Sequence, residues 1–278
     1  MKKKNARFYA ALWGAKGMIG VFRLLGKNGT HVPGRKAINF CGDFLDMIDK
    51  PDYIIAVTGT NGKTTVANLI ADVLQDQGYE FMENRFGGNI DSGIASALIK
   101  NSTLFGHMGK KLAVLEVDER MNTKIFPYVQ PDLLVVTNLF RDSYRRNAHT
   151  DFISGILNKT IPSKTKLILN GEDLISSHLA PDNDRVYFGI DCEDIETNNT
   201  DNIIQDMTAC PKCGSLIDFK YRRYNHIGIG HCPNCDFGSP DLDYCVTKVD
   251  MEKGRVYISH GPEMAELKLR GRNITDVY

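Results

Sequence analysis

A glycine-rich segment between an apolar run and a helical pattern carries the clearest chemistry in the sequence. Residues 58–65 read Thr-Gly-Thr-Asn-Gly-Lys-Thr-Thr, follow the apolar run 53–57 and precede residues 66–74, which have helical spacing. In such a loop the backbone N–H groups can turn toward phosphate oxygens, and the start of the helix adds its positive dipole end. Lys63 would then reach the β- and γ-phosphates of a nucleotide, and the Thr64 hydroxyl would bind Mg²⁺.

The loop differs from the usual phosphate-binding sequence at one position. The usual sequence is Gly-x-x-x-x-Gly-Lys, and this chain has Val57 at the position of the first glycine. An ordinary strand-to-helix turn is the alternative, but the loop, the lysine, the hydroxyl and the flanking elements agree, so the sequence favours phosphate binding. The predicted nucleotide-binding residues of the loop are Gly59, Thr60, Asn61, Gly62, Lys63, Thr64 and Thr65.

Two further apolar runs, 112–117 and 133–137, end in residues that could complete the site. Both runs are unbroken and rich in β-branched residues, which is typical of strands buried on both faces of a parallel sheet. Glu116 lies near the end of the first run, and Asn138 and Asp142 follow the second. We expect Glu116 to be a catalytic ligand of the phosphate-bound Mg²⁺, and the other two to contact the γ-phosphate or a second metal. The alternatives are a solvated strand-end acid and ordinary loop capping.

Four of the seven cysteines form two C-x-x-C pairs separated by eighteen residues. Each pair places two thiolates on one tight turn, and two pairs complete a tetrahedral, closed zinc site that is structural and not catalytic. Redox or iron–sulfur use is the alternative. Residues 218–224 between the pairs suit a strand of a zinc ribbon, and the three other cysteines are expected to be small, partly buried apolar residues. The predicted zinc ligands are Cys210, Cys213, Cys232 and Cys235.

Helical and extended patterns alternate along the chain around these motifs. Further extended runs occur at 166–169 and 186–188. Helices are expected near residues 90–100, 151–160 and 172–179. This alternation predicts the α/β class with a doubly wound parallel sheet, which binds ligands at the carboxyl ends of its strands. Three short extended runs within 244–270 follow the cysteines, so we expect the cysteine segment to be an insert in the α/β domain.

The overall charge excludes one class of partner, while the N-terminus leaves two readings open. With 34 basic and 34 acidic residues the net charge is +0, which argues against nucleic-acid binding by bulk electrostatics.

The segment 8–25 is fairly apolar, but Lys16 and Arg23 interrupt it, so neither a signal peptide nor a membrane span is predicted and the chain should be cytoplasmic. We expect an amphipathic helix packed on the protein. The alternative is contact with an anionic membrane through the basic residues 2–7 beside Phe8, Tyr9 and Trp13.

On these motifs the chain resembles the Mur ligase family. The loop 58–65 is similar to the phosphate loop of that family, which also lacks the first glycine, and a four-cysteine ribbon in the central domain is similar to the family members that amidate lipid II. Further similar segments are 33–34, 87–90, 115–119, 137–142 and 170–173. The resemblance implies an N-terminal segment at 1–50, a central ATP-binding domain at 51–204 and 244–278, and a zinc-ribbon insert at 205–243.

The resemblance also implies a reaction and its partners. ATP and Mg²⁺ would convert the D-glutamate α-carboxylate of lipid II, at the inner membrane surface, into an acyl phosphate, with Lys63 neutralising charge. Ammonia from a separate GatD-type glutaminase would then give D-isoglutamine. The rival readings are another Mur-type amino-acid ligase and a non-catalytic module that binds ATP and zinc.

Two departures from the family pattern bear on activity. Residues 143–149 replace a more acidic family segment, which puts a second metal site in doubt. The chain ends at Tyr278, where the family continues into a C-terminal domain. We therefore expect this chain to lack that domain and to be unable to complete amidation alone.

Overall fold

The computed structural model describes residues 2–26, 31–85, 88–140, 150–192 and 207–268, which form two compact units. The first unit comprises Met1–Thr137 and Gly155–Lys166, and the second comprises Asn138–Ser154 and Leu167–Tyr278. Helix α7 (Thr150–Thr160) confirms the helix expected near 151–160 and contributes to both units. The predicted domain boundaries, which follow the sequence motifs, stay a prediction.

A parallel sheet forms the centre of the first unit. Its strands lie in the order β4-β1-β3-β2, and all three pairs are parallel. The register places Val57 of β1 beside Glu116 of β3 and Val135 of β4. The strands are β1 (Tyr53–Thr58), β2 (Phe81–Glu83), β3 (Leu112–Glu116) and β4 (Leu133–Val136). The expected strands at 112–117 and 133–137 are therefore confirmed, and because their neighbours are parallel, their polar carboxyl ends share one edge of the sheet.

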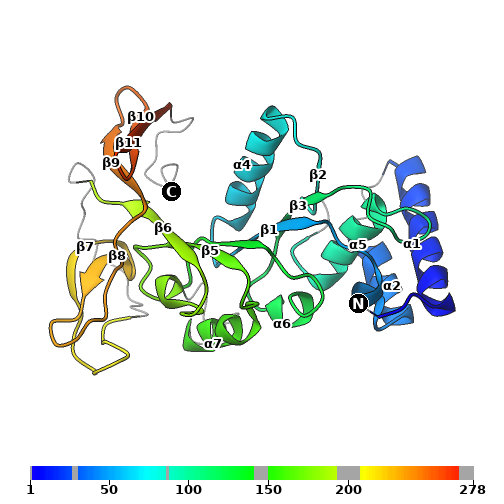
Figure 1. Cartoon of the computed structure of the whole chain (residues 1–278), viewed down its shortest axis with the longest axis horizontal. Helices are drawn as coiled ribbons and strands as arrows, with labels where there is room; N and C mark the ends of the chain where they lie inside the picture. The colour runs from blue at the N-terminus through cyan, green and yellow to red at the C-terminus, as the bar shows by residue number, and fades with distance from the viewer. Residues whose placement is uncertain (1, 27–30, 86–87, 141–149, 193–206, 269–278) are drawn as a thin grey trace. The chain divides into compact units, whose positions relative to one another are not determined.

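Helices α4, α5 and α6 connect the strands of the first unit, whereas α1, α2 and α3 precede β1, and α1 and α2 lie beside α5 (Figure 1). They are α1 (Ala6–Leu24), α2 (Val32–Phe40), α3 (Phe44–Met47), α4 (Lys63–Asp76), α5 (Asp91–Asn101) and α6 (Asn122–Ile125). Helices α2 and α5 approach closely at Gly34, where a Cβ would lie 2.0 Å from the Ser92 carbonyl oxygen. The Gly34 N–H donates to Ser96 Oγ at 2.8 Å, so glycine allows this close packing.

Helix α1 confirms the expected N-terminal helix. The Asn5 side chain caps it by accepting a hydrogen bond from the Phe8 N–H at 3.0 Å. Phe8, Ala11, Leu12 and Ala15 are buried, and their spacing places them on one face that packs against the unit. Among the described residues, no helix is long and apolar enough to cross a bilayer.

The sheet of the second unit contains both parallel and antiparallel pairs, whereas a doubly wound parallel sheet was expected. Its strands are β5 (Lys166–Asn170), β6 (Arg185–Ile190), β9 (Tyr244–Asp250), β10 (Arg255–His260) and β11 (Glu263–Lys268), in the order β11-β10-β9-β6-β5. The pairs β5–β6 and β6–β9 are parallel, whereas β9–β10 and β10–β11 are antiparallel. The connections within 250–263 are too short for a crossover, so the last strands form hairpins.

A separate hairpin lies between β6 and β9 in the chain. Strand β7 (Asp218–Tyr224) confirms the strand expected within the cysteine segment, and it pairs with β8 (Ile227–His231) in antiparallel fashion. The helix expected near 172–179 is wrong, because only a short 3₁₀ helix, η1 (Ser176–His178), is present there. The residues before it form a turn whose backbone is held by side chains: Asn170 Oδ1 accepts from the Glu172 N–H at 3.0 Å.

Candidate nucleotide-binding site and cysteine cluster

The loop between β1 and α4 has the backbone geometry that two glycines allow. Gly59 has φ 134° and Gly62 has φ 80°, and Gly62 is the N-cap of α4. Side chains at these positions would be strained, so the loop depends on glycine. Val57 lies inside β1 and is fully buried, so the turn starts only after it. This explains why no glycine is needed at that position.

Lys63, the first residue of α4, folds its side chain back over the loop. Its ammonium donates to the carbonyl oxygen of Gly59 and, at 2.9 Å, to that of Thr60. It also forms an ion pair with Glu119, with Nζ 3.2 Å from Oε2. Both side chains are largely buried, at 13% and 7% exposure. Glu119 was not assigned a role from the sequence, although it stands three residues after Glu116.

Thr64 and Glu116 come together as the sequence predicted for two ligands of one metal. The Thr64 hydroxyl donates to Glu116 Oε2 at 2.8 Å, and Asn89 Nδ2 donates to the other carboxylate oxygen at 3.0 Å. Asn84 fixes the backbone of Glu116 by two hydrogen bonds of 2.8 Å, one to each of its N–H and C=O groups. The sequence reasoning missed Asn84, although its position directly after β2 is an available signal.

The other predicted nucleotide-binding residues lie in different parts of the chain, Asn61 and Thr65 in the first unit and Asn138 in the second. Asn61 is held by Thr137, whose hydroxyl donates to the Asn61 carbonyl oxygen at 2.6 Å, and Thr65 is exposed in the first turn of α4. Asn138 follows Thr137 in the chain and belongs to the second unit. Asp142 and the segment 143–149 lie outside the described residues, so the predictions for them are untested.

The four predicted zinc ligands form one cluster in the second unit. Their sulfur atoms all lie within 4.8 Å of one another, and the pairs Cys210–Cys235 and Cys213–Cys232 are 3.4 Å apart. A Zn–S distance of about 2.3 Å places tetrahedral sulfurs about 3.8 Å apart, so the four residues fit a zinc ion. The cluster packs against a small apolar core that includes Ile217.

Hydrogen bonding and crowding shift the acidity of these thiols in opposite directions. Hydrogen bonds with Ser215 lower the pKa of the Cys213 thiol to about 6, which favours the thiolate that zinc binds. The Phe237 backbone lowers the pKa of Cys235, but desolvation and the neighbouring sulfurs outweigh this and raise it to about 12. Four thiolates at this spacing therefore need a cation to compensate their charge. The three separate cysteines are Cys41 and Cys192, both buried, and Cys245, half-buried, as expected.

Comparison with known proteins shows which family this chain is similar to. The Mur ligase middle-domain model matches residues 57–183, which begin at the phosphate loop. The MurT subunit of lipid II isoglutaminyl synthase (glutamine-hydrolyzing) from Staphylococcus aureus strain COL is 33% identical over 252 residues, covering 90% of this chain and 56% of that protein. The corresponding subunit of Streptococcus pneumoniae is 33% identical over 80% of this chain and 49% of its own length. The chain belongs to the Mur ligase family. It spans about half the length of these relatives.

Solved structures support the Mur ligase fold. A pseudomurein peptide ligase type C from Methanothermus fervidus superposes with a TM-score of 0.63 at 21% identity, over 87% of this chain and 49% of that one. MurF from Acinetobacter baumannii gives 0.54 at 13% identity, over 89% of this chain and 43% of that one. At these identities the likeness concerns the fold alone.

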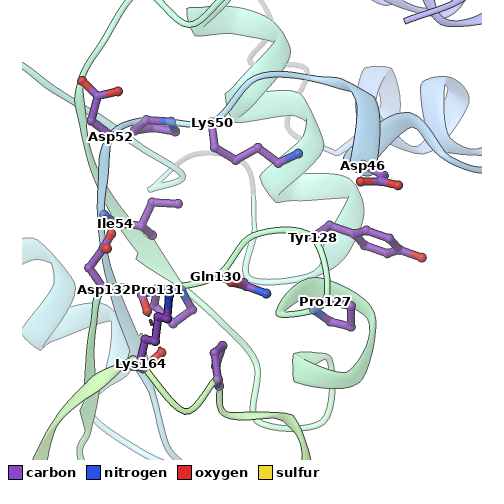
Figure 2. A pocket seen from close by; sticks show the side chains of 13 residues that line it. Asp46, Lys50, Asp52, Ile54, Pro127, Tyr128, Gln130, Pro131, Asp132 and Lys164 are labelled. Atoms are coloured by element: carbon purple, nitrogen blue, oxygen red, sulfur yellow. Dashed lines mark hydrogen bonds between the residues drawn. The ribbon is translucent and has the colours of Figure 1, made fainter. Parts of the chain in front are cut away.

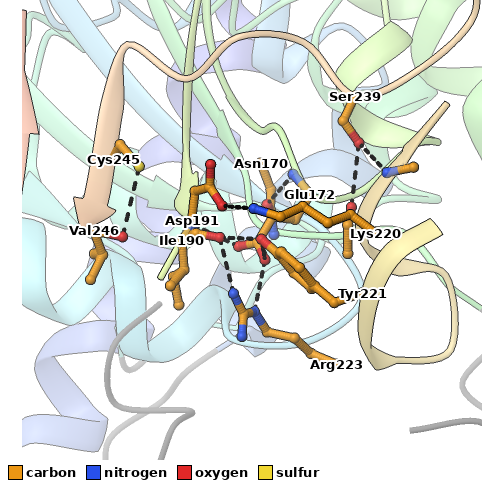
Figure 3. Close-up of polar contacts among 12 residues, drawn as sticks. Asn170, Glu172, Ile190, Asp191, Lys220, Tyr221, Arg223, Ser239, Cys245 and Val246 are labelled. Carbon is orange, nitrogen blue, oxygen red and sulfur yellow. Dashed lines mark hydrogen bonds and ion pairs between the residues drawn. The ribbon is translucent and has the colours of Figure 1, made fainter. Parts of the chain in front are cut away.

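The hairpin of β7 and β8, which lies between the two cysteine pairs in the chain, is held by a buried ion pair (Figure 3). Arg223 Nε donates to Glu172 Oε1 at 2.8 Å, and the two side chains are 6% and 0% exposed. Tyr221 donates its hydroxyl hydrogen to the same carboxylate or to the Ile190 carbonyl oxygen, and burial raises the pKa of Tyr221, which keeps it a donor. The Ile190 N–H donates to Glu172 Oε2 at 2.8 Å. Glu172 therefore joins the hairpin to β6.

Asp173 makes a second buried connection between the hairpin and the loop after β4. Its Oδ1 lies 2.8 Å from His226 Nε2, both side chains are fully buried, and Oδ2 accepts from the Leu139 N–H at 2.6 Å. Burial raises the pKa of Asp173, but the charge of His226 and the hydrogen bonds leave it below its usual value. A depressed pKa stabilises the fold above pH ~4, and this contribution is lost as the pH falls below that value.

Replacing Arg223 with methionine is expected to destabilise the hairpin by about 3–5 kcal/mol, because Glu172 would remain buried without its cation. Hydrogen–deuterium exchange of residues 218–231 measures this effect, since each ~1.4 kcal/mol corresponds to a tenfold faster exchange. The matched control is Arg222→Met on the same strand, whose guanidinium stacks on Phe219 and is only half-buried. Equal exchange in the two variants would show that the ion pair contributes nothing.

A cavity of about 420 Å³ lies at the opposite edge of the first unit's sheet (Figure 2). It is lined by residues that precede β1 and β4, among them Pro51, Asp52 and Asp132. Burial lowers the pKa of Lys50, also in its lining, to about 8, although the lysine donates to the Ile48 carbonyl oxygen at 2.7 Å. Because the phosphate loop follows the carboxyl end of β1, this cavity is not part of that site.

Proposed function

We propose that this chain is the ATP-dependent subunit of a lipid II isoglutaminyl synthase. It would activate the α-carboxylate of D-glutamate in lipid II as an acyl phosphate, for amidation to D-isoglutamine in peptidoglycan biosynthesis. The ammonia would come from a GatD-type glutaminase, so the two proteins would act as a heterodimer in the cytoplasm, at the inner membrane surface. The similarity to MurT subunits over 90% of the chain supports this assignment over other Mur-type ligases.

The observation that carries the proposal is the convergence of Lys63, Thr64 and Glu116 at the carboxyl ends of β1 and β3. Lys63 would exchange its bonds to the loop carbonyls for bonds to the β- and γ-phosphate oxygens. The Thr64 hydroxyl and the Glu116 carboxylate would hold Mg²⁺, since hard oxygen ligands suit that ion. The bound ion would neutralise negative charge that develops on the phosphates.

The proposed reaction balances without any further co-reactant. A carboxylate oxygen attacks the γ-phosphorus, the bond to the bridging oxygen of ADP breaks, and an acyl phosphate forms. Ammonia then attacks the acyl carbon, phosphate leaves with the original carboxylate oxygen, and ammonia loses a proton to give the amide. The protein's part in both steps is positioning and charge neutralisation, which are the main sources of catalysis in phosphoryl transfer.

We infer that the four cysteines bind Zn²⁺ in a structural, ribbon-like insert of the central domain. All four coordination positions would be filled by sulfur, so the metal would have no open position for a substrate. No nucleic-acid partner is needed to explain the insert.

The function is tested with the protein and its glutaminase, lipid II labelled with ¹⁸O in the glutamate carboxyl, glutamine and magnesium-ATP. The expected result is a carboxamide in lipid II by mass spectrometry and ¹⁸O in the released phosphate. Glu116→Gln is expected to weaken Mg²⁺ binding, because a charged carboxylate ligand becomes a neutral amide, with partial recovery of activity at high Mg²⁺. Thr64→Ser keeps the hydroxyl and should retain activity.

Two outcomes of this assay would overturn the proposal. Bound ATP that is never turned over would identify a non-catalytic module. A lipid II product that gains an amino-acid residue would identify a different Mur-type ligase.

A further inference from the structure

The charge of this chain is strongly uneven along its length. The first 42 residues contain nine lysines and arginines and not one acidic residue, although the whole chain has a net charge of +0. The N-terminal segment therefore has a positive net charge, and the rest of the chain has a negative net charge. Such an asymmetry indicates a surface that meets an anionic partner.

Helix α1 presents an apolar face outward as well as inward. Phe8 and Leu12 are fully buried, whereas Trp13 is 54%, Val21 54% and Leu24 88% exposed. Leu25, directly after the helix, is 63% exposed. Between them the outer face carries Gly14, Gly17 and Gly20, at which a Cβ would meet no atom within 4 Å among the described residues. The outer face is thus apolar, and small residues leave room along it.

A neighbouring loop extends this face. Trp13 Nε1 donates to the Leu104 carbonyl oxygen at 2.9 Å, which brings α1 beside Leu104 and Phe105, which are 61% and 64% exposed. Lys4 Nζ donates to the carbonyl oxygen of Gly106 in the same loop at 3.2 Å. The exposed apolar residues form what we name the N-terminal patch: Trp13, Val21, Leu24, Leu25, Leu104 and Phe105.

The basic residues around the patch are only partly neutralised. Lys2 pairs with Asp43 at 2.8 Å and Lys4 pairs with Asp49 at 2.7 Å. Arg7 and Arg23 lie at the two ends of the helix and are exposed. Since α1 itself contains no acidic side chain, positive charge remains beside the apolar face.

We propose that the N-terminal patch docks α1 flat on an anionic phospholipid bilayer. Exposed aromatic and aliphatic side chains with flanking cations, on a helix too polar to span, are the combination that binds in the interface plane. The apolar groups would enter the acyl boundary, and Arg7 and Arg23 would remain at the headgroups. Membrane docking through α1 is separate from the proposed ligase activity and does not involve the loop 58–65.

The test uses vesicles of phosphatidylglycerol and phosphatidylcholine with the intact chain. Trp13 is the only tryptophan of the chain, so its emission reports the patch directly. We expect a shift to shorter wavelength and co-sedimentation with anionic vesicles, and neither with pure phosphatidylcholine. Raising the ionic strength from about 0.01 M to about 1 M shortens the Debye length from about 30 Å to about 3 Å and should release most of the protein.

Variants distinguish docking through the N-terminal patch from non-specific adsorption of the protein to vesicles. Leu24→Glu is expected to weaken partitioning about tenfold or more, because an exposed leucine that would enter the bilayer is lost and a negative charge is added. The matched control is Leu267→Glu, a leucine on β11 that is 52% exposed and lies outside the patch; it should bind like the wild type. Charge reversal at Arg7 and Arg23 should abolish the preference for anionic vesicles.

The proposal would be wrong if the Trp13 emission did not shift with anionic vesicles, or if Leu267→Glu lost as much vesicle binding as Leu24→Glu. It would also be wrong if the glutaminase or a higher protein concentration, instead of lipid, produced the shift in emission. Magnesium-ATP binding measured on the same samples keeps the two questions apart. Leu24→Glu should bind the nucleotide normally, so failure of one proposal does not imply failure of the other.

Discussion

Replacement of Lys63 by alanine is expected to weaken magnesium-ATP binding by about 100-fold or more. A hydrogen bond to a charged group contributes about 1.5–3 kcal/mol, and the lysine ammonium would make such bonds to two phosphates. The substitution has a second cost, because Glu119 is 7% exposed and would face the triphosphate without its cation. Isothermal titration calorimetry with magnesium-ATP measures the change directly.

The contribution of Glu119 can be separated by a double variant. Lys63→Ala combined with Glu119→Gln removes the unpaired carboxylate, so it should recover about tenfold of the lost affinity, as coupled neighbours do. Lys124→Ala removes an exposed lysine of α6 and serves as the matched control that should bind normally. If Lys63→Ala bound magnesium-ATP as tightly as the wild type, the phosphate-loop assignment would be wrong and the ligase proposal with it.

The strand, loop and helix around residues 58–65 could be predicted from the sequence because the pattern that determines them is local. Glycines, lysine and threonine within eight residues determine both the backbone path and the ligand groups, and the flanking patterns determine the strand and helix. Glu116 could be placed for a related reason, since the carboxyl ends of parallel strands share an edge. The cysteine cluster was equally accessible, because the spacing of two C-x-x-C pairs restricts how the sulfurs can meet.

What the sequence could not predict are contacts between residues from distant segments. Glu119 pairs with Lys63 across 56 positions, and Arg223 pairs with Glu172 across 51. Neither carboxylate differs in type or spacing from an ordinary surface acid. The helix expected at 172–179 is absent for the same reason. Glu172 and Asp173 form ion pairs with Arg223 and His226 of the hairpin, and these tertiary contacts outweigh the helical propensity of the segment.

The second prediction with a large effect concerns the cysteines. Cys210→Ser or Cys232→Ser is expected to reduce bound zinc to well below one equivalent and to unfold the segment around the cluster. Structural zinc contributes about 10–16 kcal/mol of apparent binding free energy in small zinc domains, so its loss exceeds what most local packing can offset. Zinc content by elemental analysis and exchange protection of residues 207–238 measure the two effects.

The loss should remain local, which distinguishes a structural metal from a catalytic one. The hairpin keeps its Arg223–Glu172 and His226–Asp173 pairs, and the phosphate loop belongs to the other compact unit. Magnesium-ATP binding should therefore be retained in the cysteine variants, and Cys245→Ser, outside the cluster, should change neither property. Full zinc occupancy in Cys210→Ser would contradict the four-sulfur site. Loss of nucleotide affinity together with zinc would contradict a purely structural role of the metal.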